Sequence, residues 1–405
     1  MDMKQFLLSI LFIVGFSINV TAMSIKFQFY GTDLSVKAKK NGVPHIERYD
    51  SVNVMNVINY IEKNHIFDAT IKDCLALKEK LQLNDWGYFV MVDDLAKSYV
   101  YKYSYSLKVA PIIMAYICSR SGYDIQLGLV SYNQVGLLYA TNYNVYSTPY
   151  VTNNDKKYFF YKKKGEHIIE VKNISLIRIG NAGKSLDFTL LTPPKLKKTM
   201  VEGERQESKM CNKGWDFTLK VNKNLMDFYN DYPSSYKLDN IMTGFTSFAE
   251  TPLSDEVKAQ LYPSIKKLLS GNDQLADVNA LLCWVQFGFS YKTDGIVWGY
   301  ERQFFPEESL YYPYLDSGDR SSLFARLVAD LVGLKMIYMY SQDMGHTAIG
   351  VHFTDQEVQG DYYEYQGEKY IICDPTFFNA DAGKKMSRWD MNKVKVFPIK
   401  GVSKE

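Results

Sequence analysis

The sequence predicts an α+β protein, in which blocks of helices and blocks of antiparallel strands follow one another along the chain. Three observations support this class. Apolar residues recur at helical spacing in several long segments, and β-forming residues cluster in short runs between turn residues elsewhere. The two kinds of segment come in blocks rather than in strict alternation. Because 405 residues are more than one ordinary hydrophobic core holds, we expect two or three domains.

Residues 1–22 have the pattern of a secretory signal peptide. Lys4 precedes an apolar run from Phe6 to Phe16, and small residues precede a cleavage point after Ala22. The apolar run is shorter than the roughly 20 residues that a membrane-spanning helix needs. We therefore expect an exported protein of the periplasm or cell surface, with no integral membrane segment after signal cleavage.

Residues 23–166 are predicted to form a first α+β module. A strand is expected from Met23 to about Lys40, and two helical segments follow, Ser51 to Leu81 with a break near Asn64, and Asp94 to Arg120. The β runs that come next predict strands at Asp124–Tyr132, Val135–Ala140, Val145–Val151 and Lys157–Lys162.

Residues 167–250 are predicted to form a small β-rich, sandwich-like module, because only strand patterns occur from His167 to about Tyr232. Residues 251–405 are predicted to form a third module. Its expected elements are helices at Ser254–Leu269 and Asp273–Ser290, a helix that begins near Ser317, and strands at Lys335–Tyr340, His346–Phe353 and Lys369–Cys373. The order of a helix followed by three strands repeats the order in the first module, which we interpret as a second copy.

Composition and charge argue against several classes of function. The net charge of +2 and the absence of a long basic tract give no reason to expect nucleic-acid binding. Five cysteines and five histidines show no metal-ligand spacing, so we expect neither a metal site nor a cofactor. Buried free thiols are expected at Cys74, Cys118, Cys283 and Cys373.

Three polar residues of the last module are predicted to meet at one place. His346 begins one strand and Asp374 follows the end of a later one, so antiparallel pairing of the two strands would bring them within hydrogen-bond distance. Ser317 stands at a helix start, where free backbone N–H groups favour negative charge. A nucleophile, an imidazole and a carboxylate placed in this way form a catalytic triad.

The segment that carries these residues resembles the transglutaminase-like superfamily, and more narrowly it is similar to exported members from Bacteroidetes-type bacteria. The likeness covers Ala280 to Gly383, about a quarter of the chain, and its motifs are WGYERQFFPEESLYYPYLDSGDR, GHTAIGVHF and KYIICDPTF. It implies a papain-like fold, in which a helix bearing the nucleophile packs on an antiparallel sheet. It places Ser317 at the nucleophile position, His346 at the base and Asp374 at the orienting carboxylate.

The resemblance also implies a class of chemistry and of ligand. It implies that the ancestors of this chain catalysed acyl transfer or hydrolysis at amide bonds of peptides or proteins. Trp298 and Tyr300, which lie in the motif before the nucleophile helix, are the expected substrate-binding residues.

The chain departs from the family pattern where catalysis depends on it. The family has Asp-Cys-Glu-Asp-Arg where this chain has DSGDR, from Asp316 to Arg320. Val297 replaces a glutamine that could bind an oxyanion. A serine hydroxyl does not ionise beside an imidazolium as a thiol does, and serine is a favoured helix N-cap. We therefore favour a capping role for Ser317 over a nucleophilic one.

In the first module, Gln134 and Lys162 fall near the histidine and aspartate positions, so we expect that copy to be non-catalytic. Three functions stay open for the whole chain. The favoured one is a degenerate transglutaminase-like pseudoenzyme that binds peptide or protein. The others are an active Ser–His–Asp amide hydrolase or acyltransferase that uses Ser317, and a surface protein that binds carbohydrate or a partner through its 32 tyrosines.

Overall fold

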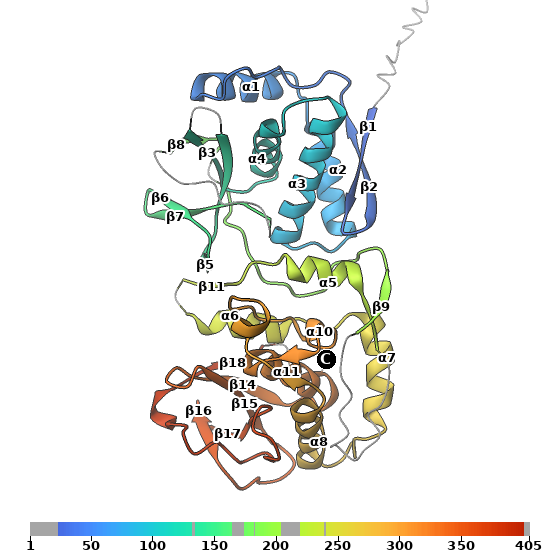
Figure 1. Cartoon of the computed structure of the whole chain (residues 1–405), viewed down its shortest axis with the longest axis vertical. Coiled ribbons are helices and arrows are strands. Elements are labelled where there is room, and N and C mark those ends of the chain that lie inside the picture. Colours follow the sequence, from blue (N-terminus) through green and yellow to red (C-terminus); the bar gives the residue numbers. More distant parts are fainter. Residues whose placement is uncertain are drawn as a thin grey trace, which may run out of the picture.

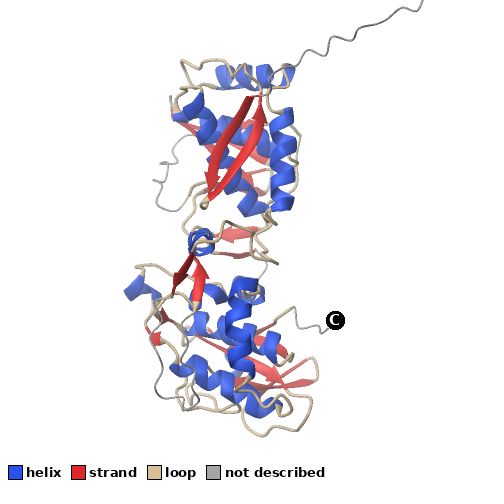
Figure 2. Cartoon of the chain, turned by 90° about the vertical axis from the view of Figure 1, so that its right-hand side faces the viewer, coloured by secondary structure: helices blue, strands red, loops and turns tan. Residues whose placement is uncertain are grey.

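A computed structural model describes residues 23–131, 134–163, 174–181, 183–203, 219–238 and 240–400. These residues form an elongated α+β molecule whose N-terminal and C-terminal halves are stacked along its long axis (Figure 1). Figure 2 shows the two halves meeting at a narrow waist. The predicted signal peptide lies outside the described residues, as do residues 164–173 and 204–218 of the region for which strands were predicted.

The N-terminal half begins with a hairpin of β1 (Met23–Phe29) and β2 (Thr32–Ala38), in which alternate side chains are buried. Tyr30 and Gly31 form its two-residue turn with positive φ values of 40° and 69°, the backbone conformation that such turns need. A single strand from Met23 to Lys40 was therefore a wrong prediction. The Tyr-Gly pair lacks the Asn-Gly or Asp-Gly signal that marks most of these turns.

Four helices follow the hairpin, and they are α1 (Ser51–Lys63), α2 (Asp68–Lys80), α3 (Asp85–Lys102) and α4 (Ala110–Arg120). The predicted break near Asn64 is confirmed. The segment Asp94–Arg120, predicted as one helical stretch, belongs to two helices. The chain turns at Ser104, where φ is 55°, and passes through the 3-10 turn Leu107–Val109 before α4.

A five-stranded antiparallel sheet packs beside α4. Its strands are β3 (Ile125–Ser131), β4 (Gln134–Ala140), β6 (Tyr150–Asn153), β7 (Lys156–Phe160) and β8 (Ser175–Arg178). They lie side by side in the order β6-β7-β4-β3-β8.

The C-terminal half contains a second five-stranded antiparallel sheet, preceded by helices. The helices are α7 (Asp255–Lys266), α8 (Gln274–Phe287), α9 (Asp294–Val297), α10 (Pro306–Ser309) and α11 (Ser317–Leu331). The strands are β14 (Lys335–Ser341), β15 (His346–His352), β16 (Tyr362–Tyr365), β17 (Glu368–Cys373) and β18 (Val394–Pro398). Two short strands, β12 (Ser290–Tyr291) and β13 (Tyr314–Leu315), pair in parallel beside them.

The two sheets have the same strand order. The C-terminal order is β16-β17-β15-β14-β18, and the N-terminal order is β6-β7-β4-β3-β8. Taken in chain order, β3, β4, β6, β7 and β8 therefore correspond to β14, β15, β16, β17 and β18. In each half a helix, α4 or α11, comes directly before the first of these strands and packs on the sheet. The repeat of element order predicted from the sequence is therefore present in the topology.

The region 167–250 does not form the predicted sandwich in its described part. Its strands pair with distant partners, because β8 completes the N-terminal sheet and β11 (Ser235–Lys237) pairs with β5 (Tyr143–Val145). Only β9 (Met200–Glu202) and β10 (Lys220–Asn222) pair with each other. Two helices that the sequence analysis missed also lie here, α5 (Lys223–Asn230) and α6 (Met242–Glu250), and α6 packs on α11 and β18.

One hydrophobic core runs through both halves. A chain of contacting aromatic rings crosses the waist. The distance between ring centroids is 6.4 Å from Trp86 to Tyr232 and 5.1 Å from Tyr232 to Phe305. Tyr229 also stacks on Phe305 at 4.3 Å. Such aromatic pairs add about 0.5–1.5 kcal/mol each beyond simple burial, so the halves are packed against each other rather than loosely tethered.

The bonding state of the cysteines agrees with the prediction at three positions and differs at one. Cys74, Cys118 and Cys373 are buried free thiols, as predicted. Cys283 is disulfide-bonded, so the free thiol predicted there is wrong; an odd and widely spaced set of cysteines gives no pairing signal. None of the helices in the described ranges has the length and apolar character needed to cross a membrane.

Candidate functional site

The start of α11 is capped by Asp316 and not by Ser317. Asp316 Oδ1 accepts a hydrogen bond from the Asp319 N–H at 3.0 Å, and Asp319 Oδ2 accepts one from the Asp316 N–H at 3.3 Å. This reciprocal pair is a capping box. The prediction that Ser317 caps the helix is therefore wrong by one residue. Ser317 is the first helical residue, is 6% exposed, and has no hydrogen bond from its hydroxyl to a described residue.

His346 and Asp374 lie together as predicted. β15 and β17 are antiparallel neighbours, so the first residue of one strand comes near the residue that follows the other. His346 Nε2 lies 2.9 Å from Asp374 Oδ2, and both side chains are buried. The predicted hydrogen bond is present, and it leaves Nδ1 as the ring nitrogen that could face a substrate.

Backbone groups fix the Asp374 carboxylate for this contact. Asp374 Oδ1 accepts hydrogen bonds from the Thr376 N–H at 2.9 Å and from the Phe377 N–H at 3.2 Å. The two oxygens therefore have separate partners, and the turn after β17 holds the carboxylate in one orientation. Trp389, which is buried, places its ring edge-on to the imidazole of His346 at 5.7 Å.

The first turn of α11 is held against the strands that carry His346. Tyr338 of β14 donates a hydrogen bond from its hydroxyl to the Gly318 carbonyl at 3.0 Å. The hydroxyls of Ser321 and Thr347 lie 3.1 Å apart, which joins the helix to β15 one residue after His346. Ser317 therefore stands on a helix start whose position relative to the histidine is fixed from two strands.

Arg320 joins this helix to the turn that carries Asp374. Its Nη1 donates to the carbonyls of Gln286 at 2.9 Å and Pro375 at 3.3 Å, and its Nη2 donates to the carbonyl of Phe289 at 2.7 Å. The side chain is fully buried, and burial lowers the pKa of its guanidinium to about 10. A buried cation that bonds to backbone carbonyls organises the chain around it, and here it organises the turn after β17.

Gln286 supports the same turn from α8. Its Nε2 donates to the carbonyls of Asp374 at 3.0 Å and Ala380 at 2.9 Å, and the side chain is 1% exposed. Both amide hydrogens are thereby used inside the protein. We assign Gln286 and Arg320 a positioning role for Asp374, which the sequence pattern could not reveal because both act through tertiary contacts.

Carboxylates surround the helix start. Burial raises the pKa of Asp316, and burial together with the charges of Asp316 and Asp294 raises the pKa of Asp319 well above its usual range. Burial, followed by the charge of Asp316, raises the pKa of Asp294 to about 7. Each of these shifts favours the protonated, uncharged form of the carboxyl group, so the helix start carries less negative charge than three ionised carboxylates would give.

Two exposed aromatic side chains lie over Arg320 beside the site. Tyr291 is 43% exposed and Phe378 is 46% exposed, and the Arg320 guanidinium lies 5.6 Å and 5.3 Å from their ring centroids. Exposed aromatic rings beside a buried polar centre are suited to contact a peptide. Their role could not be predicted from the sequence, since nothing in their local pattern separates them from other aromatic residues.

Trp298 and Tyr300, the predicted substrate-binding residues, differ from each other in their surroundings. Trp298 packs on the Arg302 guanidinium at 4.4 Å and edge-on to Tyr312 at 5.1 Å. Arg302 in turn forms a buried ion pair with Glu308. Trp298 is therefore part of a packed cation–aromatic cluster, whereas Tyr300 is 46% exposed.

Cys373 is not placed to replace the missing thiol. Its Sγ lies 3.7 Å from the Ile371 carbonyl oxygen. The side chain is buried in the hydrophobic core, and this burial raises the pKa of its thiol. A buried, protonated thiol is a poor nucleophile. No three His, Cys, Asp or Glu side chains of the described residues are arranged to hold a metal ion.

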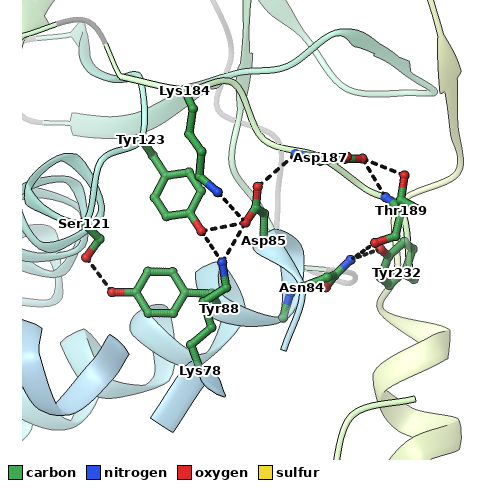
Figure 3. Close-up of polar contacts among 11 residues, drawn as sticks. Lys78, Asn84, Asp85, Tyr88, Ser121, Tyr123, Lys184, Asp187, Thr189 and Tyr232 are labelled. Atoms are coloured by element: carbon green, nitrogen blue, oxygen red, sulfur yellow. Dashed lines mark hydrogen bonds and ion pairs between the residues drawn. The ribbon is translucent and has the colours of Figure 1, made fainter. Parts of the chain in front are cut away.

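A second polar cluster lies in the N-terminal half, around Asp85 at the start of α3 (Figure 3). Asp85 Oδ1 accepts from Lys78 Nζ at 2.7 Å, Tyr123 Oη at 2.7 Å and Lys184 Nζ at 3.1 Å, and Oδ2 accepts from the Asp187 N–H at 3.2 Å. Burial opposes ionisation, but these bonds hold the pKa of Asp85 below its usual value. The cluster joins α2 and α3 to the segment 183–189, and we assign it a structural role.

Stacked tyrosines at the far end of α3 are also used internally. Tyr103 and Tyr105 stack at 5.8 Å. Their hydroxyls donate to the carbonyls of Lys39 at 2.5 Å and Val43 at 2.9 Å. This tyrosine group holds the segment after β2 and gives no support to a carbohydrate-binding surface there.

Comparison of the chain with protein-family models, with curated proteins and with solved structures finds no match.

Proposed function

We propose that the C-terminal half is a transglutaminase-like module that binds a peptide or protein segment beside Ser317 without catalysing its conversion. The observation that carries this proposal is the residue at the start of α11, where Ser317 stands in place of the thiol of the family pattern.

Acyl transfer needs free donors where negative charge develops on the substrate carbonyl. Gln286, an amide near the site, is fully engaged by two backbone carbonyls. Serine must also lose its proton during attack, which makes it more dependent on these donors than a thiolate would be.

Binding needs less than catalysis, and the features that support it are present. The His346–Asp374 hydrogen bond and the Arg320 contacts keep the site ordered. Tyr291 and Phe378 offer exposed aromatic surface beside it. We propose that an extended peptide lies over these two rings, beside the turn that Arg320 holds.

We further propose that the protein is exported. The pattern of residues 1–22 supports this proposal, and so does the disulfide bond of Cys283. Disulfides form and persist in oxidising compartments and are rare in the cytosol.

A second candidate function is amide hydrolysis or acyl transfer by Ser317, and one observation favours it. Ser317 does not cap the helix, and its hydroxyl has no hydrogen bond to a described residue. It stands at the start of α11, and the His346–Asp374 hydrogen bond that a triad needs is present on the sheet against which α11 packs. The hydroxyl has no structural task that would explain its presence.

Labelling with a fluorophosphonate, which reacts with activated serines, separates the two functions. The purified full chain, the Ser317→Ala variant and a control with the exposed Ser387 changed to Ala are compared. Our proposal expects equal, background labelling in all three. Labelling that is lost in Ser317→Ala and kept in Ser387→Ala would establish the catalytic alternative.

Peptide binding is tested separately with an immobilised peptide library. We expect selected peptides to bind Ser317→Ala as well as the wild-type chain. The double variant Tyr291→Ala, Phe378→Ala should bind them at least about tenfold more weakly, since aromatic contacts dominate such interfaces. Unchanged binding by the double variant would contradict the assigned surface.

A further inference from the structure

A cavity of about 210 Å³ lies in the N-terminal half, between α3, α4 and the sheet strands β4 and β7. Its apolar wall includes Ala110 and Met114 of α4, Leu137 of β4 and Phe160 of β7. It does not overlap the Ser317 site, and the inference drawn from it does not depend on the function proposed for that site.

The cavity occupies the place that the Ser317 site occupies in the other half. The shared strand order pairs α4 with α11, β4 with β15 and β7 with β17. Ala110 is the first residue of α4, as Ser317 is of α11. Lys162 lies just beyond β7, as Asp374 lies just beyond β17. Where one half has Ser317 and the His346–Asp374 pair, the other has a cavity with a largely apolar wall.

The charged residues of the cavity leave one positive charge in excess. Asp93 lines the space together with Lys97 and Lys162. The Asp93 carboxylate is matched, because it lies 2.9 Å from Lys97 Nζ and 3.7 Å from Lys163 Nζ. Lys163 is shared with Asp94. Lys162 is half-buried and has no ion pair with a described residue, so its ammonium is available to a ligand.

The size of the cavity limits the ligand. A cavity of about 150 Å³ lined by apolar side chains holds one benzene molecule. A space of about 210 Å³ therefore holds a phenyl ring or a branched aliphatic group with a few further atoms. Apolar pockets with a small number of placed polar groups are the usual form of small-molecule sites.

We propose that this cavity binds a monocarboxylate with an apolar body of about the size of a phenyl ring, and that Lys162 pairs with the carboxylate. The same chemistry is offered by a free small organic acid and by the C-terminal carboxylate of a peptide that ends in an apolar residue. A di- or triphosphate is too large and too polar for this space.

Calorimetric titration of the full chain with phenylacetate and with phenylacetamide tests the proposal. The two probes have nearly the same shape and differ in charge. A charge-assisted hydrogen bond is stronger than a neutral one, so we expect the wild-type chain to bind phenylacetate at least about tenfold more tightly. Lys162→Met should remove most of this preference, while Lys72→Met, at an exposed lysine of α2, should keep it.

A cavity-filling variant gives an independent measurement. Ala110→Leu places a larger side chain in the space, and we expect it to weaken both probes by at least about tenfold. If that variant fails to fold, the comparison of Lys162→Met with Lys72→Met still decides. Equal affinity of the wild-type chain for the two probes, no binding of either, or an unchanged preference in Lys162→Met would overturn the proposal.

A tetrapeptide that ends in phenylalanine, with a free or an amidated C-terminus, identifies the source of the carboxylate. Preferential binding of the free form, lost in Lys162→Met, would assign the cavity to peptide termini. Binding of phenylacetate but not of this peptide would assign it to small organic acids. Either result supports the shared chemistry.

Discussion

Glu307 gives a pH dependence of stability that can be isolated by one substitution. Its side chain is 1% exposed and accepts hydrogen bonds from the N–H of Ser254 at 2.6 Å and from its Oγ at 2.9 Å. Ser254 caps α7, so the contact fixes that helix against α10. Burial raises the pKa of Glu307 from 4.5 to about 7.

The sign of the effect follows from the protons bound in each state. Between pH 4.5 and about 7 the folded chain keeps the Glu307 proton, whereas the unfolded chain releases it. The contribution to the free energy of unfolding is therefore complete below pH 4.5 and is lost as the pH rises through 7. At about 1.4 kcal/mol for each pKa unit, the loss amounts to about 3 kcal/mol.

Glu307→Gln should remove this contribution, because an amide does not titrate and still accepts the Ser254 N–H. We expect urea denaturation to show a decrease in stability between pH 5 and pH 8 that is about 2.5 kcal/mol smaller in the variant than in the wild-type chain, because part of the loss occurs below pH 5. Glu357→Gln, at an exposed carboxylate, is the control and should keep the wild-type decrease. Equal decreases in wild type and Glu307→Gln would refute the reasoning.

Three further predictions concern the site, the Asp85 cluster and the disulfide. Trp389→Ala should lower the free energy of unfolding by about 3–5 kcal/mol through the cavity it leaves. Because the Trp389 ring packs edge-on to the His346 imidazole, the variant should also react faster with diethyl pyrocarbonate at His346. An unchanged rate of modification would show that Trp389 does not shield the imidazole. Asp85→Ala should lower the free energy of unfolding by about 1–3 kcal/mol, because the half-buried Lys78 and the buried Tyr123 hydroxyl lose their partner, while the exposed Asp381→Ala should change it by less than about 0.5 kcal/mol. Reduction of the Cys283 disulfide should lower the free energy of unfolding by about 2–4 kcal/mol and should therefore lower the melting temperature. An unchanged melting temperature in excess reductant would show that the disulfide does not stabilise the fold.

Much of the fold follows from local patterns. The helices at Ser51–Lys63 and Asp68–Lys80 and the strands that carry His346 and Cys373 lie where apolar periodicity and β-forming runs predict them. The hydrogen bond between His346 and Asp374 was also predictable, because antiparallel pairing alone brings a strand start near the end of its neighbour.

Other features depend on information that no short window contains. Aspartate and serine are both good N-caps, so the pair Asp316-Ser317 left the helix start uncertain by one residue. Gln286 and Arg320 reach the Asp374 turn from distant positions in the chain, and only the packed structure shows this. The short strands β8 and β11 find partners far away in sequence, which is why a local β pattern wrongly indicated an independent sandwich.

The position of β18 has a consequence for how the chain acquires its structure during synthesis. This strand, Val394–Pro398, pairs with β14 at the edge of the C-terminal sheet, and α6 packs against it. It follows the other four strands of this sheet in the chain, so the C-terminal sheet stays one strand short until β18 itself has emerged from the ribosome. The N-terminal sheet can close long before, since all its strands precede Ile179, and domains fold in order of their emergence. A nascent chain stalled before Val394 would therefore show a protease-resistant N-terminal half and an unfinished edge at β14.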